Sequence, residues 1–132
     1  MNATYTVTSP TAIQATVPAT ATSGPISVTT PGGTATSTGN FTVMVRLTVT
    51  KTSPLGVGNG TVTSTSSPAS ANQIDCGPTC SVEFAYGTVV TLTATPALLS
   101  VFNGWDGCDS TSGTSCTLTI KSASTVTVHF LP

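Results

Sequence analysis

The stretch MVRLTVTK, residues 44–51, alternates apolar and polar residues over the length of one β-strand. Its valines and threonines are β-branched, so they lose rotamer freedom in a helix and suit a pleated sheet. The whole chain shares this composition: 30 of its 132 residues are threonine, and charged residues make up only 5%, against about 25% in an ordinary globular domain. Because good helix formers are also scarce, we predict an all-β protein.

Strand-length runs continue on both sides of this stretch, each bounded by turn residues. They cover residues 3–9, 12–18, 24–33, 35–43, 61–67, 81–87, 88–96, 100–108, 115–121 and 124–130. The first four follow one another at about ten-residue spacing, which is typical of a β-sandwich. Between 44–51 and 61–67, the segment LGVGNG (55–60) contains Asn-Gly, which predicts that the two runs form a hairpin.

Charge and hydrophobicity exclude two classes of partner, nucleic acids and the membrane interior. The net charge is −1 with only three Lys or Arg, so the chain cannot build the basic face of a nucleic-acid-binding protein. No apolar run approaches the roughly 20 residues that span a bilayer, so we expect no membrane insertion.

The region after Met1 lacks the features of a signal peptide, and we expect a processed precursor or a truncated chain. The low charge, the many hydroxyl side chains and the even number of cysteines predict a secreted protein at the bacterial cell surface.

The first of two segments of the chain, residues 1–43, resembles a known family. VPATATSGPISVTTPGGTATS (17–37) and NFTV (40–43) make residues 3–43 resemble the C-terminal half of an IPT/TIG domain, which is immunoglobulin-like. The resemblance implies that the first strands of such a domain should precede residue 3. Half a sandwich leaves an inner face bare and strand edges unpaired. We expect the second segment, another copy of the chain or an upstream segment to cover them.

The second segment, 44–132, resembles the divergent InlB B-repeat family of bacterial secreted and surface proteins. The motifs that carry this resemblance are LTVTK, GNGTV, CGPTC with Phe84, GTVVTLTATP, FNGWDGC, and CTLTI followed by VTVHF. The resemblance implies a compact, β-grasp-like module without catalytic activity. The expected organisation is therefore a partial Ig-like domain at 1–43 and a small disulfide-stapled B-repeat-like module at 44–132.

Four cysteines carry the most distinctive spacing in the chain, C-x3-C at Cys76 and Cys80 and C-x7-C at Cys108 and Cys116. A structural zinc site usually reads CxxC, and a redox pair lies at a helix N-terminus, which this sequence does not predict. We favour two local disulfides, 76–80 and 108–116, because Gly-Pro and the Ser/Thr/Gly loop can each bring two Cα atoms within bonding range. Other connectivities, metal binding and free thiols remain alternatives.

Trp105, with Asn103 and Asp106 beside it, is a candidate ligand contact, because an exposed tryptophan stacks on sugar rings. The interpretation that we favour is a core aromatic, since few large side chains supply the burial in a small β module. His129 lies on the opposite strand face from Val126 and Val128, so we expect it to be exposed. We identify no Ser–Asp or Cys partner for it and expect no role.

The four acidic residues allow two further readings. A glycosidase needs two carboxylates facing each other across a cleft, and Asp106 with Asp109 are candidate calcium ligands. We favour solvated carboxylates that cap turns, and we expect no cofactor. The acidic residues are Asp75, Glu83, Asp106 and Asp109. Three Asn-x-Thr sequons, at Asn2, Asn40 and Asn59, are candidate glycosylation sites if the producing cell glycosylates asparagine.

These observations predict a non-catalytic extracellular structural or adhesive module. Its expected partners are other copies of itself or neighbouring surface-protein domains, with self-assembly into a filament by strand complementation as the sharper hypothesis. The alternative is a carbohydrate-binding accessory module of a secreted hydrolase, which would hold polysaccharide through Trp105, Asn103 and Asp106.

Overall fold

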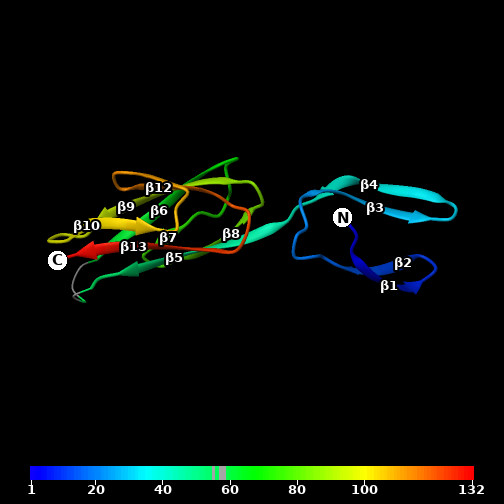
Figure 1. Ribbon diagram of the computed structural model, residues 1–132, viewed down its shortest axis with the longest axis horizontal. Helices are drawn as coiled ribbons and strands as arrows, with labels where there is room; N and C mark the ends of the chain where they lie inside the picture. The colour runs from blue at the N-terminus through cyan, green and yellow to red at the C-terminus, as the bar shows by residue number, and fades with distance from the viewer. Residues whose placement is uncertain (55, 57–58) are drawn as a thin grey trace. The chain divides into compact units, whose positions relative to one another are not determined.

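Every regular element that the structure describes is a β-strand, which confirms the all-β prediction (Figure 1). The structure is a computed structural model, and it describes residues 1–54, 56 and 59–132. The strands form two compact units, Met1–Val43 and Met44–Pro132, which we call unit 1 and unit 2. Within the described ranges there is no helix with the length and hydrophobicity needed to cross a membrane.

Unit 1 consists of two antiparallel hairpins. Its strands are β1 (Thr4–Ser9), β2 (Ala12–Thr16), β3 (Gly24–Thr30) and β4 (Gly33–Phe41), and they confirm the four predicted runs. β1 pairs with β2 and β3 pairs with β4. Pro10 and Pro31 begin the two connecting turns, in agreement with the fixed φ that proline brings to the first central position of a turn.

Unit 2 is built from two sheets. The four-stranded sheet has the order β10-β13-β5-β8, and the five-stranded sheet has the order β11-β12-β9-β6-β7. The strands are β5 (Met44–Thr52), β6 (Gly60–Ser67), β7 (Asp75–Cys76), β8 (Ser81–Ala85), β9 (Val89–Pro96), β10 (Val101–Asp106), β11 (Ser110–Ser112), β12 (Ser115–Thr119) and β13 (Ser124–Leu131). All of these strands except the two shortest, β7 and β11, overlap a run predicted from the sequence.

The four-stranded sheet is mixed. Its first and last strands in chain order, β5 and β13, lie side by side and parallel in the middle, while β8 and β10 pair antiparallel at the two edges. Numbered along the chain, the strands read 3-4-1-2 across the sheet, which is the arrangement of a β-grasp sheet. The five-stranded sheet supplies the second layer of the fold.

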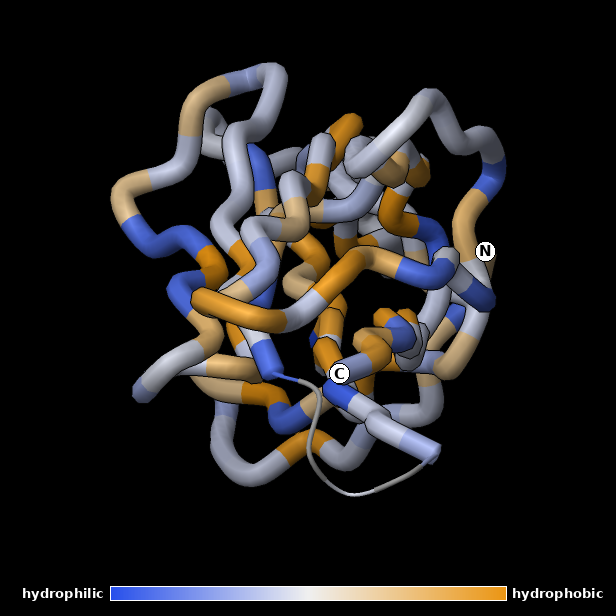
Figure 2. Tube along the Cα trace, turned by 90° about the vertical axis from the view of Figure 1, so that its left-hand side faces the viewer, coloured by the Kyte–Doolittle hydropathy of each residue, from blue (hydrophilic) through white to orange (hydrophobic). Residues whose placement is uncertain are grey.

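A single hydrophobic core joins the two sheets. Residues on alternate positions of each strand are buried, as in β6, β9 and β13, and Figure 2 shows hydrophobic residues, in orange, alternating with more hydrophilic ones along the trace. The largest fully buried side chains are Phe84, Phe130, Leu47, Ile74, Leu92 and Ile120. The outer face of the five-stranded sheet is threonine-rich, and Thr61, Thr63 and Thr65 of β6 pair with Thr95, Thr93 and Thr91 of β9.

The predicted hairpin around Asn59-Gly60 is wrong. β5 lies in the four-stranded sheet and β6 in the five-stranded sheet, so the segment between them crosses from one layer to the other. Leu55, Val57 and Gly58 of the predicted turn lie outside the described residues. The physical reason is burial: both strands carry an apolar face, and the two faces are buried against each other when the strands belong to opposite sheets.

Candidate functional site

The disulfide between Cys76 and Cys80 closes the loop that passes from the five-stranded sheet to the four-stranded sheet. Cys76 lies on β7 and is fully buried, and the Cα atoms of the two cysteines are 4.4 Å apart. Beside the bridge, the amide of Asp75 donates to the carbonyl of Thr79 at 2.9 Å, and the amide of Thr79 donates to the carbonyl of Asp75 at 2.7 Å. The carbonyl of Cys80 then accepts from the amide of Val49 on β5 at 2.7 Å. The bridge therefore fixes the edges of both sheets.

The second disulfide also connects the two layers. Cys108 follows β10 of the four-stranded sheet, whereas Cys116 lies on β12 of the five-stranded sheet, with 5.7 Å between their Cα atoms. The amide of Asp109 donates to the carbonyl of Thr117 at 3.0 Å, beside the bridge. All four cysteines are thus paired in the local connectivity that the sequence analysis favoured.

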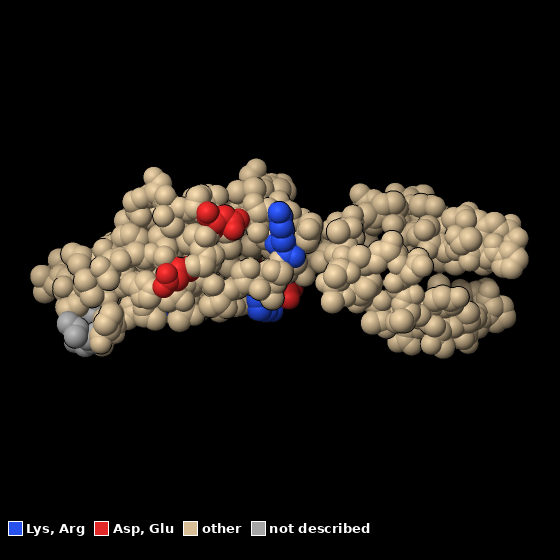
Figure 3. All heavy atoms as spheres, in the orientation of Figure 1, with Lys and Arg blue, Asp and Glu red and all other residues tan. Residues whose placement is uncertain are grey.

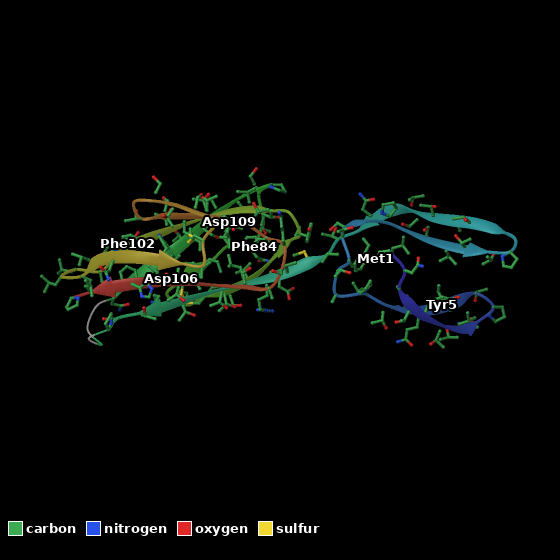
Figure 4. All side chains as sticks on the ribbon, viewed as in Figure 1. Met1, Tyr5, Phe84, Phe102, Asp106 and Asp109 are labelled. Atoms are coloured by element: carbon green, nitrogen blue, oxygen red, sulfur yellow. A yellow bond between two sulfur atoms is a disulfide. The ribbon has the colours of Figure 1, made fainter. Side chains whose placement is uncertain are left out.

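Trp105 does not form a platform with its neighbours. Its ring packs against the core, 5.9 Å from the ring of Phe102, and its indole N–H donates to the carbonyl of Thr114 at 3.2 Å. A bulge in β10, at Gly104 with φ of 135°, brings Phe102 and Trp105 to the same face although they are three residues apart. Asn103 lies in the bulge. Asp106, the residue after Trp105, points to the opposite face, toward His129; Figure 4 labels Phe102 and Asp106.

Asp106 belongs to a hydrogen-bonded chain that the sequence analysis missed. Its Oδ2 lies 2.6 Å from Nε2 of His129, and Nδ1 of His129 lies 2.6 Å from Oγ1 of Thr52. An ionised carboxylate can only accept, so Nε2 carries the proton in the neutral ring and Nδ1 accepts from the Thr52 hydroxyl. These two hydrogen bonds join β10, β13 and β5 across the outer face of the four-stranded sheet.

The expectation that His129 has no partners is therefore wrong, although its strand face was predicted correctly. The side chain is half-buried, with 29% exposed, and not fully exposed as expected. The pairing depends on the parallel register of β13 and β5, in which His129 lies opposite Thr52, 77 residues away in the chain. No local pattern in the sequence signals such a register.

The order of hydroxyl, imidazole and carboxylate is that of a nucleophile, its base and the group that orients the base. The side chain of Asp106 is 75% exposed, so water screens the charge that would stabilise an imidazolium. Two open hollows on the described surface are lined by other residues. One involves Met44, Arg46, Ala71, Asn72, Gln73, Thr79, Ser81, Val82 and Glu83, and the other Val28, Thr30, Gly32, Gly33, Thr34 and Ala35.

The remaining acidic residues are separated. Asp109 accepts from the amide of Thr119 at 2.8 Å, across the open end of the β11–β12 hairpin, and Glu83 lies 3.3 Å from Arg46 on the exposed side of β8. Over the ranges 1–54, 56 and 59–132, no three His, Cys, Asp or Glu side chains come together as a metal site. The sequon residues Asn2, Asn40 and Asn59 are all exposed.

Residues 76–132 match the model of a known family, the divergent InlB B-repeat domain. The matched segment begins at Cys76, contains all four cysteines and includes every strand from β8 to β13. No curated protein and no solved structure matches the chain. The resemblance of residues 3–43 to an IPT/TIG domain lies outside the matched segment and stays a prediction. The matched family suggests an extracellular bacterial surface module, and the two disulfides are consistent with that location.

Proposed function

We propose that this chain is a non-catalytic structural module of a bacterial surface protein whose copies assemble through unit 1. Unit 2 supplies a disulfide-reinforced body, and unit 1 supplies strands that need a partner. The observation that carries the proposal is that the strands of unit 1 are exposed. Every residue of its four strands is exposed except Gly24, which is half-buried.

The exposed strands of unit 1 have apolar faces. In the first hairpin Tyr5 pairs with Ala15 and Val7 pairs with Ile13, so these four side chains share one face. Tyr5 is 68% exposed and Val7 63%. In the second hairpin Ile26 is 55% exposed and Val28 39%. A monomer would leave these faces in water, and burial of apolar surface contributes about 25 cal/mol per Å².

The edges of both hairpins are also open to pairing. Each hairpin is a two-stranded sheet, so each of its strands has one edge outside the hairpin ladder. Such edges accept an added strand from another chain. Unit 1 also lacks the charges that commonly protect edges, because residues 1–43 contain no Asp, Glu, Lys, Arg or His. Figure 3 shows the coloured charged side chains of that view on unit 2.

A head-to-tail contact that does not close on itself gives a filament, whereas a self-complementary contact gives a dimer. We propose the filament, with other copies of the chain or neighbouring surface-protein domains as partners. The alternative function as a carbohydrate-binding module has less support, because Trp105 packs inward while Asp106 points outward on the same strand.

Sedimentation velocity and negative-stain electron microscopy of the purified chain test the proposal. We expect concentration-dependent assembly into elongated particles. Because unit 1 has no Asp, Glu, Lys, Arg or His, we expect assembly to persist from low to high sodium chloride and to strengthen in sodium sulfate. A chain that stays monomeric at high concentration in sulfate would contradict the proposal.

The non-catalytic part of the proposal has its own test. A chain incubated with p-nitrophenyl acetate should show no acetyl group on Thr52 by peptide mass spectrometry, and the ester should hydrolyse at the same rate with the Thr52→Val variant. An adduct on Thr52 that disappears in His129→Gln would instead show that the hydrogen-bonded chain activates the hydroxyl.

A further inference from the structure

The turn between β9 and β10 exposes two adjacent leucines, which is unusual for a surface that is otherwise rich in hydroxyl groups. Leu98 is 92% exposed and Leu99 is 87% exposed. Val101, at the start of β10, is 53% exposed. We call residues 97–100 the leucine tip. Contiguous exposed apolar side chains of this kind mark interaction surfaces more often than isolated ones do.

The backbone of the leucine tip is held in a strained conformation. Leu99 has a φ of 65°, and it is the one described residue other than glycine with a positive φ. A side chain disfavours this left-handed region. Three hydrogen bonds fix the turn: Ala97 N–H to Asn59 O at 2.9 Å, Ser100 N–H to Ala97 O at 3.0 Å, and Asn59 N–H to Ser100 Oγ at 3.0 Å. The tip is therefore preformed, and strain held in place by its surroundings points to a function.

The leucine tip lies at a defined end of unit 2. Val101, next to the tip, pairs with Leu131 at the end of β13, and β13 runs parallel to β5. The tip is thus near the end of β5 that carries Thr52, whereas unit 1 is attached at the other end, before Met44. At about 3.3 Å per residue, β5 separates these two ends by roughly 26 Å. Figure 2 looks onto the end of unit 2 that carries the C-terminus.

We propose that the leucine tip of one copy docks on the exposed apolar hairpin faces of unit 1 in another copy. This inference rests on the proposed assembly and names its second surface. Both surfaces belong to the same chain, and neither residues 1–43 nor residues 88–105 contain an Asp, Glu, Lys, Arg or His. Their contact therefore buries apolar surface without removing a charge from water.

The two surfaces differ, so the contact is heterologous. Each copy offers one leucine tip and one set of hairpin faces, and occupation of both by different neighbours gives an open chain of copies. The preformed turn lowers the entropy lost on docking, because the backbone of the tip is already ordered. Strand pairing at the edges of unit 1 can act together with this contact.

The first experiment compares assembly of the wild-type chain with that of Leu98→Ser and Leu99→Gly by sedimentation velocity. We expect at least a tenfold rise in the concentration at which each variant assembles. Leu99→Gly is the sharper variant, because glycine suits the positive φ and should raise the melting temperature while the apolar side chain is lost. Val89→Ser, which removes another exposed aliphatic side chain from β9, should assemble like wild type.

The second experiment identifies the occupant directly. A photo-reactive benzoylphenylalanine replaces Leu98 in the full chain, and isotopically heavy and light chains are mixed before irradiation. We expect crosslinked peptides that join position 98 of one isotope to residues 1–43 of the other. Crosslinks confined to single chains, or none above the level given by the same group at position 89, would overturn the inference.

The outcomes separate this inference from the proposed function. If wild type assembles and both leucine variants assemble equally well, the leucine tip is not the contact, and assembly through unit 1 stands. If wild type remains monomeric, the proposed function fails and the inference fails with it. Flotation of the wild-type chain, but not Leu98→Ser, with phosphatidylcholine vesicles would assign the tip to a lipid surface and overturn docking on a second copy.

Discussion

Gly60 begins β6 at a point that has no space for a side chain. A Cβ atom placed there would lie 2.5 Å from two ring carbons of Phe130 and 2.6 Å from the carbonyl oxygen of Thr95. Phe130 is fully buried, so its ring cannot move aside without disturbing the core. The glycine of the Asn-Gly pair thus serves close packing between the two sheets.

We predict that Gly60→Ala lowers the free energy of unfolding by about 1–3 kcal/mol, the usual cost of overpacking a core. Urea denaturation followed by Trp105 fluorescence measures the change. Gly77→Ala is the matched control, because a Cβ at Gly77 meets nothing within 4 Å. Equal stability of the two variants would show that the contact with Phe130 relaxes freely.

Leu99 and Leu98 allow a paired test of backbone strain. Leu99→Gly removes about 1–2 kcal/mol of left-handed strain, and the extra freedom of glycine in the unfolded chain offsets about 0.4–1 kcal/mol of this. We predict a net gain of about 0.5 kcal/mol. Leu98→Gly, at a position without positive φ, should lose stability instead. Differential scanning calorimetry distinguishes the two, and a loss for both variants would contradict the strain.

The Asp106–His129 contact connects neighbouring strands, β10 and β13, at the surface. Because the carboxylate side chain is 75% exposed, we predict a coupling energy below about 1 kcal/mol. A double-mutant cycle with Asp106→Asn and His129→Gln, measured by urea denaturation in low and high salt, gives this value. A coupling well above that limit would mean that the hydrogen-bonded chain holds the sheet together.

The two disulfides differ in the length of the segment they close. Their cysteines are 4 and 8 residues apart, so loss of chain entropy predicts contributions of about 2 and about 2.5 kcal/mol. We predict that Cys108→Ala with Cys116→Ala destabilises unit 2 slightly more than Cys76→Ala with Cys80→Ala. The pairs are well matched, because Cys76 and Cys116 are each fully buried. A much larger loss for the 76–80 pair would show that its link between the sheets outweighs chain entropy.

Across the whole molecule, the two units differ in how they are stabilised. The core of unit 2 draws on both of its sheets, whereas unit 1 consists of two hairpins with exposed strands. Isolated two-stranded hairpins are marginal in water. The disulfides also belong entirely to unit 2.

We predict that hydrogen exchange separates the units. In dilute solution the amides of β1–β4 should exchange close to the rate of an unfolded chain, while those of β5, β9 and β13 should exchange only through global opening. On assembly, protection should appear in unit 1 and at the leucine tip. Slow exchange of β1–β4 in a dilute monomer would show that unit 1 is stable without a partner.

The strands were predictable because their signal is local. Alternation of apolar and polar residues, β-branched side chains and turn residues lie within a few positions of one another, so they identify β1–β6, β8–β10, β12 and β13 without knowledge of their partners. The short cysteine spacings are local in the same sense, because nearby cysteines under turn residues can bond without long-range folding. The conformation of Leu99 carried no such signal, since nothing around it resembles a left-handed turn.

Pairing in space followed from contacts that no short window contains. The Asn-Gly hairpin failed because Leu47 of β5 and Val62 of β6 are both buried in the core shared by the two sheets, which places their strands in opposite layers. His129 meets Thr52 and Asp106 because the last strand of unit 2 lies between the first strand and β10. Chain neighbours therefore specify which residues form strands, while burial of the apolar faces of distant strands specifies which strands meet, because that burial is only complete in the assembled sandwich.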